Sequence, residues 1–488
     1  MKIIITIRRL FFYFAIVVIA ASSCKKTEIV TLTIQQPAAA FSENVVDPFT
    51  GYETQRSVNY IDSVFYFKNA SDSGVNIKYS WDFGDGITSA DKDPKHSYAR
   101  RGSYTVKLIV SNNNRAFDTV QQNVSVILGQ RAISLGEGID ISPVAIEETN
   151  TNEFVLLAAG GYTTNYSYYL FQLDSLMKQK SMKTFPAGYR FISMKPTADG
   201  NYIFTGSTHG SDKNNELIKM KADGSELWNK TLSADDNYDY AVQTADGGYT
   251  VVGTRTVTTG NDVNYNTVVI KTDGNGNPQR QKVLNAEGMA FASNAVIEQD
   301  GVTLAGIKRG NCLDCDSVLI LRLDNTGNVV WKNAVIVALY NNAWGDTYIT
   351  KLTSGNYAVT SGNTKGIFFF SPTGVFLDRK LAGNDVASIC NSGDGNLIVL
   401  QSEYGNGFRM SVAKLTLEGA QQWYAYPDGR QMRPGGYSCC SDSRPATLQR
   451  LRNGGVIVTG SDLLDNSTND NHYSVILLLE LDDAGNLK

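Results

Sequence analysis

The sequence is poor in the residues that most often carry catalysis or bind metals. It has only three histidines, His96, His209 and His472, among 488 residues. No two of them lie at a spacing typical of metal ligands. A Gly-x-Ser-x-Gly elbow and a phosphate-cradling glycine loop are also missing. Most acidic residues sit in turn motifs, so we predict no catalytic residue and no metal site.

Long apolar runs and clustered positive charge are scarce too. The one continuous apolar stretch, Leu10–Ala21, is interrupted only by Tyr13 and is too short to span a bilayer comfortably. The formal net charge is -4, and no basic cluster stands out. We therefore expect neither a membrane-spanning helix nor a nucleic-acid partner.

The N-terminus carries an export signal. Lys2, Arg8 and Arg9 precede the apolar run, and Ala21-Ser22-Ser23-Cys24 follows it. Small residues before a lone cysteine resemble a bacterial lipoprotein signal, in which the cysteine is acylated and becomes the new N-terminus. The resemblance implies that residues 1–23 are removed and that Cys24 anchors the chain to the outer membrane by lipid alone. Whether the protein would face outwards or into the periplasm stays open.

Five cysteines remain after Cys24. Export permits disulfides, and an odd number leaves at least one thiol unpaired within the chain. The candidates for disulfides are two close pairs, Cys312 with Cys315 and Cys439 with Cys440. The first pair could instead bind metal, but a second pair at zinc spacing is missing.

A short β-rich domain follows a polar tether at residues 24–36. Its motifs are Trp81-Asp82-Phe83-Gly84-Asp85-Gly86, His96-Ser97-Tyr98 and the alternating run Gly102–Val110. The alternation predicts a half-buried strand, and the Asp and Gly residues predict a tight turn. Trp81 is expected in the core, and His96, with no second histidine nearby, is expected to be structural.

These motifs resemble the polycystic-kidney-disease (PKD) domain over residues 37–128. The resemblance implies an immunoglobulin-like β-sandwich that acts as a spacer or interaction module and carries no chemistry. One departure is a long polar stretch at residues 43–59.

The rest of the chain, residues 129–488, is repetitive. One repeated element is a hairpin turn such as Asp246-Gly247-Gly248-Tyr249, and a second is a turn such as Asp324-Asn325-Thr326-Gly327. Seven copies of each, spaced about 40 to 60 residues apart, predict seven four-stranded blades. The repeats resemble bacterial β-propellers of the Asp-Gly-Gly-Tyr type, so the predicted fold class is all-β, a PKD sandwich plus a seven-bladed propeller.

The propeller is expected to close with a strand from the beginning of this region. The last repeat stops at residues 486–488, where its fourth strand would begin. Residues 130–135 precede the first hairpin with the spacing of a fourth strand. We predict that this segment completes the last blade, because closure removes an unpaired sheet edge.

Function is expected in the long loops. The short turns all fall on one face of the propeller, whereas the long and varied loops fall on the other, where binding residues are usually found. Four residues in the inter-blade loops are of the types that anchor interfaces: Tyr340, Trp344, Arg433 and Tyr437. We predict a binding protein for a glycan or protein partner, with no cofactor.

Two alternatives remain open at this point. Propellers also form enzymes, and a glycan hydrolase or lyase, or a quinone-dependent dehydrogenase, would use a pocket at the propeller axis. The adjacent Cys439 and Cys440 resemble the vicinal disulfide of quinoprotein dehydrogenases, but only Trp228, Trp331 and Trp423 fill the blade tryptophan positions. Asn- and Asp-rich loops offer oxygen ligands for Ca²⁺ but lack a calcium-loop pattern.

Overall fold

The chain divides into two compact units, Met1–Val126 and Ile127–Lys488. The division falls close to the boundary predicted after Leu128. The described residues form strands and turns and include no helix, hence none that is long and apolar enough to cross a membrane. The computed structural model describes residues 37–46, 53–54, 59–60, 64–71, 77–100, 102–112, 117–127, 131–135, 139–162, 165–208, 215–259, 262–284, 290–308, 317–336, 347–361, 366–382, 385–405, 407–425, 445–466 and 471–485.

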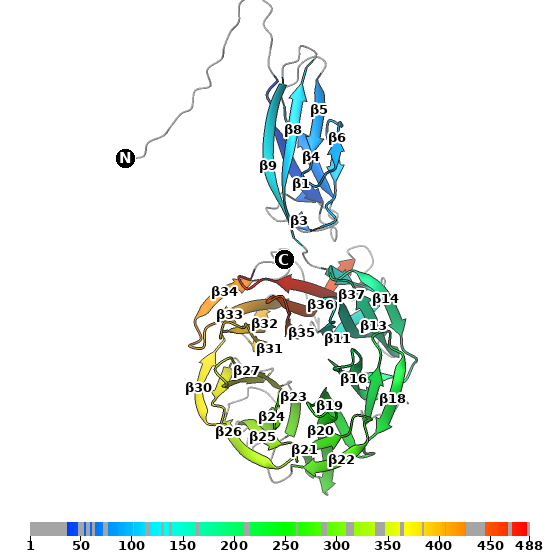
Figure 1. Cartoon of the computed structure of the whole chain (residues 1–488), viewed down its shortest axis with the longest axis vertical. Coiled ribbons are helices and arrows are strands. Elements are labelled where there is room, and N and C mark those ends of the chain that lie inside the picture. Colours follow the sequence, from blue (N-terminus) through cyan, green and yellow to red (C-terminus); the bar gives the residue numbers. More distant parts are fainter. Residues whose placement is uncertain are drawn as a thin grey trace, which may run out of the picture. The chain divides into compact units, whose positions relative to one another are not determined.

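The first unit is a sandwich of two antiparallel sheets (Figure 1). In spatial order, one sheet is β2 (Glu53–Thr54), β1 (Phe41–Val46), β4 (Phe65–Asn69) and β7 (Lys95–His96). The other is β3 (Asn59–Tyr60), β9 (Phe117–Ile127), β8 (Gly102–Ser111), β5 (Lys78–Asp82) and β6 (Thr88–Ser89).

Trp81 is the centre of this sandwich, as predicted. It is fully buried, its ring centroid lies 5.1 Å from that of Phe41 and 5.8 Å from that of Phe67, and its indole Nε1 donates to the carbonyl oxygen of Asp91 at 2.9 Å. Aromatic pairs at such distances add to the free energy of burial. The indole therefore contacts both sheets with its one polar group bonded.

The Trp-Asp-Phe-Gly-Asp-Gly turn depends on a glycine. Gly84 has a φ of 82°, and a Cβ there would lie 2.9 Å from the carbonyl oxygen of Thr105. His96 stacks on Phe83 with ring centroids 4.2 Å apart, and its Nε2 lies 2.8 Å from Oδ2 of Asp85. These contacts give His96 a structural position in the sandwich, as expected.

The second unit is a ring of seven four-stranded antiparallel sheets, or blades, formed by its described residues (Figure 1). The predicted all-β fold class is confirmed. Blade 1 is β11 (Asp140–Glu148), β12 (Phe154–Tyr162), β13 (Asn165–Leu173) and β14 (Gln179–Thr184); blade 2 is β15 (Arg190–Pro196), β16 (Tyr202–Ser207), β17 (Glu216–Met220) and β18 (Glu226–Thr231); blade 3 is β19 (Asp236–Gln243), β20 (Tyr249–Thr259), β21 (Asp262–Thr272) and β22 (Pro278–Val283). Blade 4 is β23 (Ala290–Glu298), β24 (Gly301–Lys308), β25 (Ser317–Asp324) and β26 (Val329–Ile336); blade 5 is β27 (Thr347–Lys351), β28 (Tyr357–Ser361), β29 (Gly366–Phe370) and β30 (Phe376–Leu381); blade 6 is β31 (Asp385–Asn391), β32 (Leu397–Gly405), β33 (Gly407–Leu415) and β34 (Gln421–Ala425); blade 7 is β35 (Pro445–Arg450), β36 (Val456–Asn466), β37 (Asn471–Leu481) and β10 (Arg131–Ile133).

The blades give the ring two different ends. In each blade the first strand lies innermost, and the antiparallel order puts its two hairpin turns at one end, which we call the turn end. Residues 149–153 and 174–178 are the turns of blade 1. The strand termini that are joined by the connections between second and third strands, and by those from blade to blade, lie at the opposite end, which we call the loop end.

Glycines in the second strand let the inner strand bulge. The register of β15 against β16 shifts between Phe191 and Ser193, opposite Gly206. The register of β19 shifts in the same way opposite Gly253. A Cβ at either glycine would collide with a backbone carbonyl oxygen of the inner strand, that of Arg190 or Asn237. The repeated Thr-Gly or Val-Gly of the sequence thus reflects a close backbone approach.

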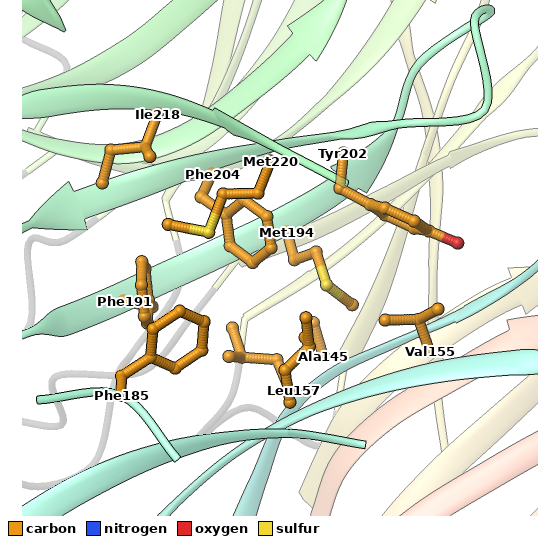
Figure 2. Packing of buried hydrophobic residues seen from close by; sticks show 11 residues of the cluster. Ala145, Val155, Leu157, Phe185, Phe191, Met194, Tyr202, Phe204, Ile218 and Met220 are labelled. Atoms are coloured by element: carbon orange, nitrogen blue, oxygen red, sulfur yellow. The ribbon is translucent and has the colours of Figure 1, made fainter. Parts of the chain in front are cut away.

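Apolar side chains fill the space between neighbouring blades. Figure 2 shows this packing between blades 1 and 2, where Leu157 from one blade and Phe191, Met194 and Phe204 from the other lie in one cluster. All four are at most 1% exposed. Each blade therefore depends on its neighbours to bury its faces.

Three tryptophans pack neighbouring blades against each other. Trp228, Trp331 and Trp423 each lie in the fourth strand of a blade and contact a turn glycine of the next blade. Trp423 also donates from Nε1 to the carbonyl oxygen of Asp483 at 2.9 Å. The glycines have positive φ and no side chain, which leaves room for the indole ring. The tryptophans are therefore accounted for by blade packing.

The ring closes where its beginning meets its end. Residues 131–133, inside the segment predicted to complete the last blade, form β10 and pair antiparallel with β37. Ile133 opposes Ile476 and is 6% exposed. At the turn end, the Arg452 backbone amide of blade 7 donates to Oε2 of Glu148 in blade 1 at 2.9 Å. The beginning and the end of the propeller are thus joined by strand pairing within blade 7, and blades 7 and 1 are joined by a side-chain bond.

Candidate functional site

The predicted site residues lie outside the described residues. This holds for the predicted lipidation site, the predicted binding residues and the disulfide candidates. They are Cys24; Tyr340, Trp344, Arg433 and Tyr437; and Cys312, Cys315, Cys439 and Cys440.

The strands that bound the two predicted binding loops are described. β26 ends at Ile336 and β27 begins at Thr347, while β34 ends at Ala425 and β35 begins at Pro445. Each connection runs from the outer strand of one blade to the inner strand of the next. Both therefore join strand termini at the loop end.

Cys390, in β31, is the one cysteine among the described residues, where it has no disulfide partner. Burial raises the pKa of its thiol to about 12, against a smaller lowering effect from Arg450. The nucleophile and metal ligand is the thiolate, which a buried thiol of this kind does not form near neutral pH. Cys390 is partly buried and packs against the apolar cluster between blades 6 and 7, so we assign it a structural role.

At the turn end, a backbone amide in each of two blade turns is bonded by a side chain of the next blade. The Ala198 amide donates to Oε1 of Gln243 at 2.8 Å, and the Arg452 amide donates to Oε2 of Glu148 at 2.9 Å. In both pairs the accepting side chain belongs to the last residue of the inner strand of the neighbouring blade. These bonds link neighbouring blades and satisfy donors that would otherwise need solvent.

Ion pairs occupy the same end. Lys219 pairs with Asp199 at 2.7 Å, Lys271 with Asp246 at 2.8 Å, and Lys414 with Asp394 at 2.7 Å, each from the third strand to the hairpin turn of one blade. A repeated pairing of this kind indicates a structural role. Hydrogen bonds from Lys271 and Thr244 lower the pKa of Asp246 to about 2. The turn end is thus built from groups that already bind one another.

An ionic cluster lies on the inner strands near the ring axis. Nζ of Lys195 in β15 lies 2.7 Å from Oε1 of Glu147 in β11, and Nε2 of Gln449 in β35 donates to Oε2 of Glu147 at 2.8 Å. The same ammonium lies 6.0 Å from the ring centroid of Tyr240 in β19. We call these four residues the axial cluster; they come from blades 1, 2, 3 and 7.

The axial cluster keeps Lys195 charged. Burial by itself would lower the pKa of this ammonium, but Glu147 outweighs that effect and raises it. The Glu147 side chain is 4% exposed, while that of Lys195 is 33% exposed. Because both carboxylate oxygens of Glu147 are bonded, this residue is poorly placed to act as a general base.

The loop end of the junction between blades 1 and 2 carries an aromatic group. The blade-to-blade connection Phe185–Tyr189 stacks Tyr189 on Phe185, with ring centroids 5.5 Å apart and planes at 26°. Tyr168 in β13 meets Phe191 edge-on at 5.4 Å. Phe185 and Phe191 are buried, whereas Tyr168 and Tyr189 are half-buried. Two tyrosine rings are therefore presented on a rigid apolar base.

Arg190 lies between these tyrosines in the chain and is exposed. Burial raises the pKa of Tyr168, and a hydrogen bond and charge interaction with Arg190 partly offset this. Nearby, the Glu216 carboxylate accepts from the Thr208 amide at 2.9 Å and from its hydroxyl at 2.8 Å. We call Tyr168, Tyr189 and Arg190 the blade 1–2 platform.

Sequence reasoning missed this platform because it considered only long loops. The connection that contains Tyr189 is short, so Tyr189 and the neighbouring Arg190 fell outside the long loops in which binding residues were expected. A usable signal was the density of tyrosine in residues 162–169, which precede the connection by one strand. Tyrosine is favoured at binding surfaces because it offers a large contact area at low entropic cost.

The described ranges contain no group of three or more His, Cys, Asp or Glu side chains placed to hold a metal ion. His209 and the side chain of His472 lie outside them.

Comparisons with known proteins bear mainly on the first unit. The PKD domain family model matches residues 46–127. Pre-pro-metalloprotease PrtV of Vibrio cholerae is 45% identical over 65 residues, which are 13% of this chain and 7% of that protein. Collagenase ColA of Bacillus cereus is 41% identical over 56 residues, 12% of this chain and 6% of that protein. The chain thus spans well under a tenth of the length of these curated relatives.

Among solved structures, a streptogramin B lyase is 14% identical with a TM-score of 0.44, covering 74% of this chain and 97% of its own. Similarity at this level does not bear on activity. The family match and the two-sheet sandwich together identify residues 46–127 of this chain as a PKD domain.

Proposed function

We propose that this chain is a lipid-anchored binding protein of the bacterial envelope. In this proposal the PKD domain is a spacer, and the loop end of the propeller presents the site for a glycan or protein partner. The main support is the set of side chains exposed at the loop end. Turn-end amides and charges are bonded between and within blades. At the loop end Arg255 pairs with the buried Asp236, and half-buried tyrosines and an exposed arginine lie there as well.

An axial enzyme is the less favoured alternative. The axial cluster holds a carboxylate whose two oxygens are bonded to Lys195 and Gln449. A general acid or base needs a proton-transfer position open to substrate. We therefore assign the axial cluster a structural role, and propose neither a cofactor nor a nucleic-acid partner.

The anchor can be tested at Cys24. Cys24→Ala should abolish labelling with palmitate and leave uncleaved or mislocalised protein, since the acyl chains supply the membrane affinity. Fractionation and metabolic labelling of cells expressing either form measure this. A variant that still takes up label and partitions into detergent would contradict the anchor.

The loop-end site can be tested at the predicted residues. The double variant Trp344→Ala, Tyr437→Ala should weaken partner capture at least tenfold, because truncating an aromatic anchor of an interface costs on the order of 2 kcal/mol or more. Capture on a glycan array and by pull-down measures the effect. The melting temperature should stay unchanged.

The matched control is a double variant at the turn end, Asn201→Ala with Asn396→Ala, which should retain capture. Loss of capture in this control but not in the loop variant would reverse the assignment of the ends. Turnover of a glycan or reduction of a quinone-linked dye by the purified chain would replace the binding proposal with the enzyme alternative.

A further inference from the structure

We infer that the blade 1–2 platform binds a neutral glycan chain. This inference rests on the proposed binding function and narrows its ligand at one described place on the loop end. The platform combines two half-buried tyrosine rings with one exposed guanidinium, all on strands or short connections of two packed blades.

The rings are held in place before any ligand arrives. Tyr189 lies against Phe185, and Phe185 meets Phe191 edge-on at a centroid distance of 4.7 Å. Phe185 and Phe191 are at most 3% exposed. A fixed ring costs little entropy on binding. The tyrosine ring offers an apolar face of the size of one sugar ring. The C–H bonds of a sugar ring form an apolar face too, so the two rings can stack.

Arg190 adds hydrogen-bond donors beside the rings. It is the first residue of β15, so its backbone is held by pairing with Ser207 of β16. The guanidinium has five N–H donors and no hydrogen-bond acceptor, which suits the hydroxyl and ring oxygens of a sugar. A ligand with many acceptor oxygens next to an apolar face therefore matches both parts of the platform.

The charges around the platform balance, which favours an uncharged ligand. Arg190 and Lys183 are cationic, and Glu216 and Glu226 both act on Tyr189, whose pKa is raised first by burial and then by these two carboxylates. Lys183 and Glu216 are both already engaged, since Lys183 donates to the carbonyl oxygen of Gly224 at 2.5 Å and Glu216 accepts from Thr208. Arg190 and Glu226 are then left as one cation and one carboxylate. An acidic glycan would gain from Arg190 but would be repelled by the two carboxylates.

A protein partner fits the platform less well. Stable protein interfaces bury about 800 Å² on each partner. Three side chains supply a fraction of that area, whereas they suffice for one or two sugar rings. The observations therefore favour a glycan over a protein at this place.

The test uses the mature full chain, titrated calorimetrically with soluble neutral β-glucan, mannan and galactan, and with polygalacturonate as the acidic probe. The inference expects binding to at least one neutral probe, with affinity that changes little between low and high salt because no net charge is neutralised. Tyr189→Ala and Arg190→Gln should each weaken that binding about tenfold, or about 1.4 kcal/mol. Tyr189→Phe keeps the ring and should bind within about threefold of wild type.

Each other outcome counts against the inference. Salt-sensitive binding to polygalacturonate alone overturns the neutral class. Equal binding by Tyr189→Ala and wild type, with loss only in the Trp344→Ala, Tyr437→Ala variant, removes the platform but leaves the proposed function standing. If the chain binds none of the glycans and instead captures a purified protein partner, the inference fails while the binding function holds. Ser233→Ala, in the connection between blades 2 and 3, is the matched control and should bind as wild type.

Discussion

Replacing Lys195 with methionine should lower the free energy of unfolding by about 3 kcal/mol. Methionine keeps an unbranched side chain, one atom shorter than lysine, but leaves the Glu147 carboxylate, which is 4% exposed, without its cation. Breaking a buried ion pair from one side is costly because the remaining charge stays desolvated. Chemical unfolding of the full chain, followed by tryptophan fluorescence, measures the difference.

Two further variants test whether the effect comes from the stranded carboxylate. Glu147→Gln should cost less than Lys195→Met, since Lys195 is 33% exposed and its ammonium can reach water. The double variant Glu147→Gln, Lys195→Met should recover part of the loss. If Lys195→Met and the double variant are equally unstable, the ion pair is not what stabilises the junction.

Removing the closing strand should have the other large effect on stability. Replacing residues 131–135 in the full chain with a Gly-Ser stretch of equal length should destabilise the propeller by about 4 kcal/mol. About 2 kcal/mol comes from the buried Ile133 side chain, and the remainder from glycine entropy and weakened pairing with β37. For a unit of this size we expect a fall in melting temperature of several degrees.

The control replaces residues 25–29 of the tether in the same way and should leave the melting temperature unchanged. The closing-strand variant should also show faster hydrogen exchange at β37, because its outer edge would lose its partner. Unchanged exchange in β37 would mean that β10 contributes little to closing the ring.

Local sequence patterns were enough to predict the all-β fold, the PKD motif and the repeats. Asp-Gly turns require positive φ, and the period of two in Gly102–Val110 requires a strand with one buried face, so each pattern reports a constraint that acts over a few residues. The tryptophans were harder to interpret. Trp228 resembled a family feature in the sequence, whereas the structure shows it packed on Gly276 of the next blade.

The sequence by itself determined which segments become strands, where they turn and how often the unit repeats, because these depend on neighbours along the chain. Only the tertiary structure decided which polar groups meet. Glu147 and Gln449 are 302 positions apart and contact each other because the ring closes, and Tyr168 reaches Arg190 because blade 1 packs on blade 2. Contacts across blades depend on the register and twist of whole sheets, and no local pattern specifies those. The axial cluster and the blade 1–2 platform could therefore be identified only from the tertiary structure.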